Sequence, residues 1–463
     1  MFFFTILLII KEPIIKFGRR QITIDYGIAP LITLLVLIVL GYINLSTIIE
    51  ALGGNSSIIP WQIIIIFFAA AYVFISLDTT GIFEYLSFKI LKLTHNDGHK
   101  LFFYLAGFAA ILTMFTSNDI VTLTMTPIVL YLGKHSKINP LPYLMIVFFT
   151  ANTWSMIFYI GSPTNIIVAQ ALELGFFEYT KFMIIPTLVA GVLTTILAFI
   201  MFNKEIPKHV SVPRRINPQD YLINKTTAKI GLVLVFILFL TLIFSESLPY
   251  KIWEIIGFFA LVFITINLFI SYYHLEISHN SKKYHDEKTK SITHTNILFS
   301  RTNNFFMVIH RMPWKILPLI ISFFILTHVL ALNGIDDAIA IGISNFRGIF
   351  QGTIFTGIIT AISANIMIDQ PMTMLFATSM QSPHYLITDT EKLSNAFALV
   401  IGANLGDNLT LFGALAGIMW CKILKFNGVE MNYLKFLSYS IRVIPMVIII
   451  TCIVLALQMN YLA

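Results

Sequence analysis

Long apolar stretches, interrupted by a few polar residues, dominate this chain of 463 residues. A helix crosses a bilayer with about 17 to 25 mostly apolar residues. Candidate spans lie near residues 26–45, 61–78, 101–131, 141–170, 182–202, 229–247, 252–272, 316–332, 351–378, 394–425 and 436–459. Hydrophobic residues make up 57% of the chain and charged residues 11%, which excludes a soluble globular domain. We therefore predict an all-α, multi-pass protein of the cell membrane, in which the longest stretches form broken helices or hairpins.

The excess of positive charge fits cytoplasmic loops and does not require a nucleic acid partner. Lys and Arg number 30 against 23 Asp and Glu. They gather in residues 203–229 and 273–315, whereas the loop 46–60 has none. Because Lys and Arg collect on the cytoplasmic side of membrane proteins, the first two segments are predicted to be cytoplasmic and the loop external. Residues 278–296 have the composition of a flexible linker.

Neither the N-terminus nor the cysteines suggest a processed or cross-linked protein. The run FFFTILLII is preceded by no positive residue and is too short for a full span, so a shortened first helix is expected. Cys421 and Cys452 are the only cysteines, and both have apolar neighbours. No disulfide framework, metal site or cofactor is predicted.

The two halves of the chain repeat one another. Four pairs of positions recur at offsets between 250 and 253: Gly81 and Gly334, Asp119 and Asp369, Asn152 and Asn404, and Gly161 and Gly413. Many transporters consist of two related halves around a site at mid-membrane depth. We expect a first repeat over residues 1–228 and a second over 229–463, with a cytoplasmic linker at about 273–313.

The repeated segments are also where polar residues interrupt the apolar pattern. The interruptions are TSNDIVTLTMTP (116–127) and GSPTN (161–165) in the first half, and DQP (369–371) and GANLGDN (402–408) in the second. Irregular backbone at membrane depth is tolerated where it lines a cavity, and intramembrane acids are functional by default. Asp119 and Asp369 are therefore predicted to face each other across a central polar site.

A structural alternative is that these acids cap the first turns of half helices, where a carboxylate is favoured. For Asp407 the capping and the site interpretations are equally supported. Asp78, near a membrane end, is a weaker site candidate, and His328 on an apolar helix is expected to be a packing residue.

The chain resembles the arsenite and antimonite permeases (ArsB-type) of the ion transporter superfamily. The resemblance runs from about residue 10 to about 440, and its most specific segments are NDIVTLTMTPIVL and GANLGDNLTLFGALAGIMW. It implies two inverted repeats with re-entrant hairpins and broken helices, and an elevator-type transporter. Candidate protein partners are a second copy of the chain and the ATPase subunit of an arsenite pump.

The last motif departs from that family. Bacterial permeases tend to have an acid, a Pro-Lys pair and a second Pro where this chain has Asn404, Asp407-Asn408 and Leu411. They also tend to have two asparagines where this chain has Asp369 and Gln370. These differences remove a cation from the site and add acids to it.

The side chains of the site favour a neutral solute and a coupling cation. Amides and hydroxyls offer the donors and acceptors that neutral arsenite needs, whereas an anion would need cations that the site segments lack. The predicted substrate-binding residues are Ser117, Asn118, Thr164, Asn165, Gln370, Asn404, Asn408 and Thr410. Asp119, Asp369 and Asp407 are the predicted binding residues for the coupling ion, H⁺ or Na⁺.

These residues predict proton-coupled efflux of arsenite or antimonite. A sodium/proton antiporter or an anion transporter on the same scaffold is the alternative. An intramembrane aspartyl protease is remote, because Asn404-Leu405-Gly406-Asp407 lacks the first Gly of Gly-x-Gly-Asp and no Pro-Ala-Leu occurs. A passive channel is a further alternative, which saturable flux and counterflow would exclude.

Overall fold

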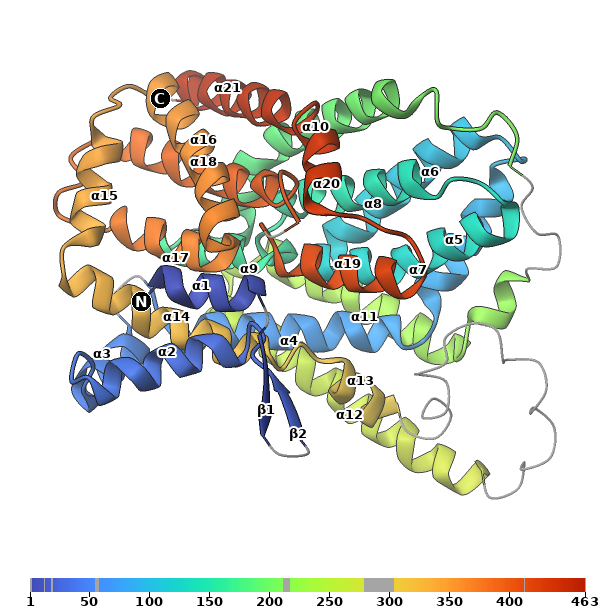
Figure 1. Ribbon diagram of the computed structural model, residues 1–463. Coiled ribbons are helices and arrows are strands. Elements are labelled where there is room, and N and C mark those ends of the chain that lie inside the picture. Colours follow the sequence, from blue (N-terminus) through green and yellow to red (C-terminus); the bar gives the residue numbers. More distant parts are fainter. Residues whose placement is uncertain are drawn as a thin grey trace. The chain divides into compact units, whose positions relative to one another are not determined.

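The computed structural model of this protein describes residues 2–11, 13–17, 20–54, 58–210, 217–278, 304–411 and 413–462. Seven helices within these residues are long and apolar enough to cross a membrane. They are α4 (Pro60–Asp78), α6 (Gly98–Phe115), α10 (Phe176–Phe202), α11 (Lys225–Ile243), α12 (Ile252–Ser278), α16 (Ile349–Met367) and α21 (Ile444–Leu462). The prediction of a helical multi-pass membrane protein is confirmed (Figure 1).

Further helices connect and flank these spans. They are α1 (Phe2–Lys11), α2 (Ile28–Val39), α3 (Leu45–Gly53), α5 (Ile82–Leu93), α7 (Asn118–Ser136), α8 (Leu141–Trp154), α9 (Pro163–Ala171), α13 (Asn304–Arg311), α14 (Ile316–Leu332), α15 (Ile335–Ser344), α17 (Asp369–Ser379), α18 (Asp389–Gly406), α19 (Leu415–Phe426) and α20 (Tyr433–Ser440). Single 3-10 turns are η1 (Ser155–Ile157), η2 (Tyr159–Gly161), η3 (Pro218–Tyr221) and η4 (Ser245–Ser247).

One short β-hairpin departs from the all-α prediction. Strands β1 (Ile14–Phe17) and β2 (Arg20–Thr23) pair antiparallel, with Ile14 opposite Thr23. Four residues per strand are too few for a period of two to stand out in the sequence. The predicted linker at 278–296 lies outside the described residues apart from Ser278, the last residue of α12.

The stretches that were too long for one span divide into two helices each. Residues 101–131 divide into α6 and α7, and residues 351–378 into α16 and α17. Helix α16 begins at Ile349, which is 251 positions after Gly98 at the start of α6, and α17 begins at Asp369, 251 positions after Asn118 at the start of α7. The order of these helices therefore repeats at the offset found in the sequence.

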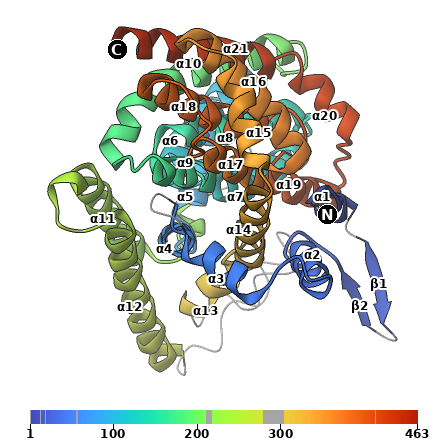
Figure 2. The same ribbon diagram turned by 90° about the vertical axis from the view of Figure 1, so that its left-hand side faces the viewer.

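The described residues form two compact units that do not follow the predicted repeat boundary. One comprises Met1–Ile64, Ser87–Ile216 and Trp314–Ala463, and the other Ile65–Leu86 and Asn217–Pro313. In the larger unit α16 packs against α18 and α21, and α6 packs against α8. In the smaller unit α11 and α12 lie side by side (Figure 2). The repeat boundaries at residues 228 and 229 stay a prediction.

Aromatic side chains hold the two halves of the larger unit together. Phe148 of α8 lies 5.0 Å from Trp420 of α19 and 5.5 Å from Phe436 of α20, measured between ring centroids. All three rings are fully buried. Burial of such large rings is a main source of packing energy, so this cluster fixes the broken helix of the first half against that of the second.

Candidate functional site

Four interruptions in helices of the larger unit carry the predicted site. Helix α6 ends at Phe115 and α7 begins at Asn118, while α16 ends at Met367 and α17 begins at Asp369. Helix α8 passes through η1 and η2 before α9 begins, and α18 ends at Gly406, with α19 starting at Leu415. Helix α7 packs against α19, and α17 packs against α9, so each half contributes to both contacts.

Local sequence explains where the helices in the first half restart. The hydroxyl of Ser117 accepts a hydrogen bond from the backbone N–H of Ile120 at the start of α7. Ser162 accepts one from Thr164, and Pro163 occupies the first position of α9. Ser is a preferred N-cap residue, and Pro suits the first helical turn. Ser117 rather than Asp119 is therefore the cap of α7.

The three predicted coupling acids occupy different helix ends. Asp119 lies in the first turn of α7, and Asp369 is the first residue of α17, where its carboxyl group interacts with the backbone amide of Gln370. Asp407 directly follows α18, at the C-terminal end of that helix. The capping interpretation is therefore wrong for Asp407, because its carboxylate lies where the helix dipole disfavours negative charge.

The structure brings these three carboxyl groups together. Asp369 interacts electrostatically with Asp119, and Asp407 interacts with both. Asp369 is 2% exposed and Asp407 1% exposed, while Asp119 is half-buried. No ion pair between described residues includes any of the three. The three carboxyl groups thus lie within electrostatic reach of one another, and their assignment to one coupling site stays a prediction.

A chain of carboxamides joins the two halves beside these acids. Asn118 donates from Nδ2 to Oδ1 of Asn152 at 3.0 Å, and Asn152 donates to Oδ1 of Asn408 at 2.9 Å. Asn408 donates in turn to the carbonyl of Phe149 at 3.2 Å and to the hydroxyl of Thr153 at 3.4 Å. In this structure Asn408 is therefore engaged by groups of the first half.

A second group of amides also forms hydrogen bonds to protein groups of the two halves. Asn404 donates from Nδ2 to Oδ1 of Asn165 at 2.9 Å and to the hydroxyl of Thr164 at 3.4 Å, and its Oδ1 accepts from Ser155 at 2.8 Å. Asn165 donates to the carbonyls of Ser155 and Phe158. Several predicted substrate-binding side chains thus bind protein groups here, among them Asn118, Thr164, Asn165, Asn404 and Asn408.

The segment after α18 is held against the start of α17. Thr410 donates to Oδ1 of Asn365 at 2.6 Å, and Asn365 donates to the carbonyl of Gly406 at 2.8 Å. The backbone N–H of Asp369 donates to the carbonyl of Gly413 at 3.0 Å. These bonds fix the irregular backbone around Asp407.

The atoms of the site that lack partners are oxygens. Among the predicted substrate-binding and coupling residues, four buried side-chain oxygens have no hydrogen-bond partner in the described part of the chain: both of Asp407, Oδ1 of Asp369 and Oε1 of Gln370. No buried side-chain nitrogen of the predicted site lacks a partner within the same residues. Buried polar atoms are normally satisfied, so these oxygens are the acceptors that a bound donor or cation would use.

Sequence reasoning did not place Asn152, Ser155 and Asn365 in the site. In the sequence Asn152 stands out only as a repeat position, and Asn365 is a single amide in an apolar run. All three form hydrogen bonds to predicted site residues. An Asn within an apolar stretch was the available signal, because a buried amide needs partners.

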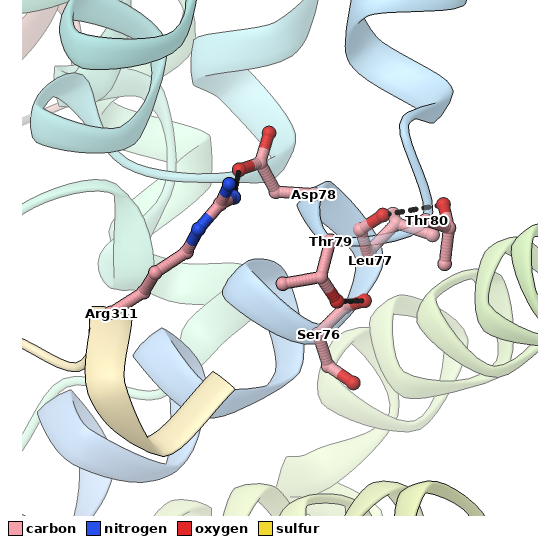
Figure 3. A network of polar contacts seen from close by, with 6 residues as sticks. All are labelled: Ser76, Leu77, Asp78, Thr79, Thr80 and Arg311. Atoms are coloured by element: carbon pink, nitrogen blue, oxygen red, sulfur yellow. Dashed lines mark hydrogen bonds and ion pairs between the residues drawn. The ribbon is translucent and has the colours of Figure 1, made fainter. Parts of the chain in front are cut away.

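The weaker candidates have contacts of their own. Asp78 forms an ion pair with Arg311 within the smaller unit, with 2.9 Å between Oδ2 and Nη1, and Thr79 beside it donates to the carbonyl of Ser76 (Figure 3). His328 Nε2 lies 3.8 Å from the carboxylate of Glu50. No group of three or more His, Cys, Asp or Glu side chains suited to a metal ion occurs in the described part of the chain.

Comparisons with known proteins agree on a transporter. Residues 6–402 match the sequence profile of the citrate transporter family (CitMHS). The chain is 24% identical to an arsenical pump membrane protein of Escherichia coli over 408 residues, which cover 87% of each chain. It is 24% identical over 401 residues to a putative arsenical pump membrane protein of Bacillus subtilis, covering 81% of this chain and 83% of that relative.

The fold is also similar to a solved transporter structure. The crystal structure of the YdaH transporter of Alcanivorax borkumensis covers 99% of this chain and 95% of its own, with a TM-score of 0.54 and 11% identity. At this identity the likeness concerns the fold alone. It agrees with a helical membrane architecture.

Proposed function

Because the chain belongs to the citrate transporter family and is a secondary transporter of the membrane, we propose that it exports arsenite or antimonite in exchange for protons. The observation that carries this proposal is the set of unpartnered oxygens on Asp369, Gln370 and Asp407. A site with free acceptors is completed by a solute that offers O–H donors or by a cation. Arsenite at neutral pH is mainly a neutral trihydroxide and offers three such donors.

The same oxygens argue against citrate as the cargo. A carboxylate brings only acceptors, and an anion placed beside three acids would need cations to balance its charge. The site segments 116–127, 161–165, 369–371 and 402–410 contain no Lys or Arg. Relatives named as arsenical pump membrane proteins support a solute of the arsenite class.

The coupling ion in this proposal is a proton carried by the acid cluster. Asp119, Asp369 and Asp407 interact with one another, so protonation of one carboxyl relieves the repulsion on the other two. Release of a proton would then leave oxygens able to accept from the next solute. A sodium/proton antiporter is the second candidate, because carboxyl oxygens of Asp369 and Asp407 have no hydrogen-bond partner among the described residues and Na⁺ prefers oxygen ligands.

Uptake into everted vesicles tests this proposal. Vesicles containing the full chain are loaded against a set pH gradient with arsenite, sodium or citrate in turn. We expect gradient-dependent uptake of arsenite and no uptake of citrate, and Asn404→Ala should reduce arsenite uptake because the cross-half amide contact to Asn165 is lost. If arsenite is not taken up while sodium is, the chain is a cation/proton antiporter. Cross-linking in the same membranes would test a homodimer and an ATPase subunit as proposed partners.

A further inference from the structure

The carboxamide of Asn152 is the central link between two of the acids in the site. It belongs to α8 in the first half and is fully buried. Its Oδ1 accepts from Asn118, and its Nδ2 donates to Asn408. Asn152 therefore contacts a side chain of α7 and a side chain of the irregular segment after α18.

Both partners of Asn152 are direct neighbours of coupling acids. Asn118 precedes Asp119, and its Oδ1 also accepts from the backbone N–H of Asp119 at 3.0 Å. Asn408 follows Asp407, and its other hydrogen bonds go to the end of α8. A continuous chain of hydrogen bonds thus runs from the backbone of Asp119 through the carboxamides of Asn118 and Asn152 to that of Asn408, the residue after Asp407.

Phe149 and Thr153 of α8 also accept hydrogen bonds from Asn408, but neither of these bonds includes Asn118. Asp407 makes no side-chain hydrogen bond of its own to a described residue, so its carboxyl group is held only through its backbone. Asp119 lies at a helix start whose hydroxyl cap, Ser117, is at a long distance of 3.4 Å from the N–H of Ile120. A fully satisfied buried amide network is rigid, whereas a partly satisfied one is not.

From this geometry we infer that Asn152 is a positioning residue that sets the separation of the Asp119 and Asp407 carboxyl groups, and with it the coupling of proton and solute movement. The inference rests on the proposed proton-coupled transport. Asn152 itself does not need to touch solute or proton. It contributes by holding a residue of each half in register with the other.

The test compares Asn152→Leu with a matched control, Asn395→Leu, in the purified full chain. Asn395 is an equally buried amide of α18, 2% exposed, whose hydrogen bond goes to the hydroxyl of Tyr385, away from the acids. Two transport readouts in proteoliposomes are compared: arsenite accumulation driven by a pH gradient, and arsenite exchange at equal pH. The ratio of the two measures coupling.

We expect Asn152→Leu to lower this ratio by about tenfold or more, because two buried amides lose a partner at once. Asn395→Leu should leave the ratio unchanged. An unchanged ratio in Asn152→Leu, or an equal fall of both readouts, would overturn the inference. If the leucine variant does not reach the membrane, Asn152→Ser supplies a smaller side chain that reaches neither partner.

A readout that needs no solute separates this inference from the proposed function. The infrared carbonyl bands of protonated carboxyl groups are recorded across a pH series and assigned with Asp119→Asn and Asp407→Asn. Asn152→Leu should shift the bands of both acids, and Asn395→Leu neither. Failure of wild-type arsenite transport with this shift present would refute the proposed cargo alone, whereas unshifted bands would refute the positioning role.

Discussion

Replacing Asp407 with Asn should abolish proton-driven transport and at the same time raise thermal stability. The wild-type carboxyl group is 1% exposed and has no hydrogen-bond partner among the described residues. It follows the last residue of α18 and interacts with Asp369 and Asp119. Each of these conditions makes an ionised carboxylate costly, and the amide of Asn carries no charge.

The position of Asp407 sets the size of the effect. A charge at an unfavourable helix end costs about 0.3–1 kcal/mol, and up to about 2 kcal/mol where it is partly buried. Removing it should therefore raise the free energy of unfolding by about 1–2 kcal/mol. Asp369 is the matched control, because it lies at the favourable N-terminal end of α17 and interacts with the amide of Gln370. Asp369→Asn should gain less stability than Asp407→Asn, because Asp369 shares the burial and the neighbouring acids but not the unfavourable helix end.

Thermal unfolding in detergent, followed by tryptophan fluorescence at mildly alkaline pH, measures both variants against wild type. Uptake driven by a pH gradient is measured on the same preparations. A lower melting temperature for Asp407→Asn, or an equal gain for both variants, would refute the reasoning from helix ends. Full transport in Asp407→Asn would refute its assignment to the coupling site.

Three further predictions follow from the remaining charges. Asp119→Asn and Asp369→Asn should each abolish gradient-driven uptake with normal amounts of protein in the membrane, and wild-type uptake in both would remove them from the site. The backbone N–H groups at the start of α6 lower the pKa of Asp97 below its ordinary value of 3.8. The Asp97 carboxylate therefore stabilises the folded protein above pH 3.8, and this stabilisation is lost as the pH falls through the lowered pKa of the folded state. Asp97→Ala should therefore have a lower melting temperature than wild type at neutral pH, and the difference should disappear in acid. Asp97→Asn should melt like wild type because Asn also caps a helix. A difference in melting temperature that does not depend on pH would contradict this. Arg311→Gln should lower the melting temperature more than Asp78→Asn, because it removes the cation beside the buried carboxylate of Asp78 and keeps the carboxylate, and equal effects would argue against that ion pair.

The sequence indicated which segments break, although not how each break is built. Thr116-Ser117 separates α6 from α7, and the segment after Gly406 separates α18 from α19. In the sequence, both breaks are marked by polar residues within apolar runs. The short β-hairpin was missed because its strands have four residues each. The grouping of helices into compact units was also beyond the sequence, since contacts between distant helices depend on how their faces pack.

The sequence itself determined that this is a membrane protein, that the order of helices repeats and that acids lie at membrane depth. These properties are local or periodic, and hydropathy and spacing report them directly. Only the tertiary structure decided which polar atoms remain free. Asn404 and Asn408 looked like substrate ligands in the sequence, yet both are satisfied by groups of the other half, and Asp407 proved to follow a helix instead of capping one. Whether a buried donor or acceptor is free depends on partners more than two hundred residues away, and no local pattern encodes those distances.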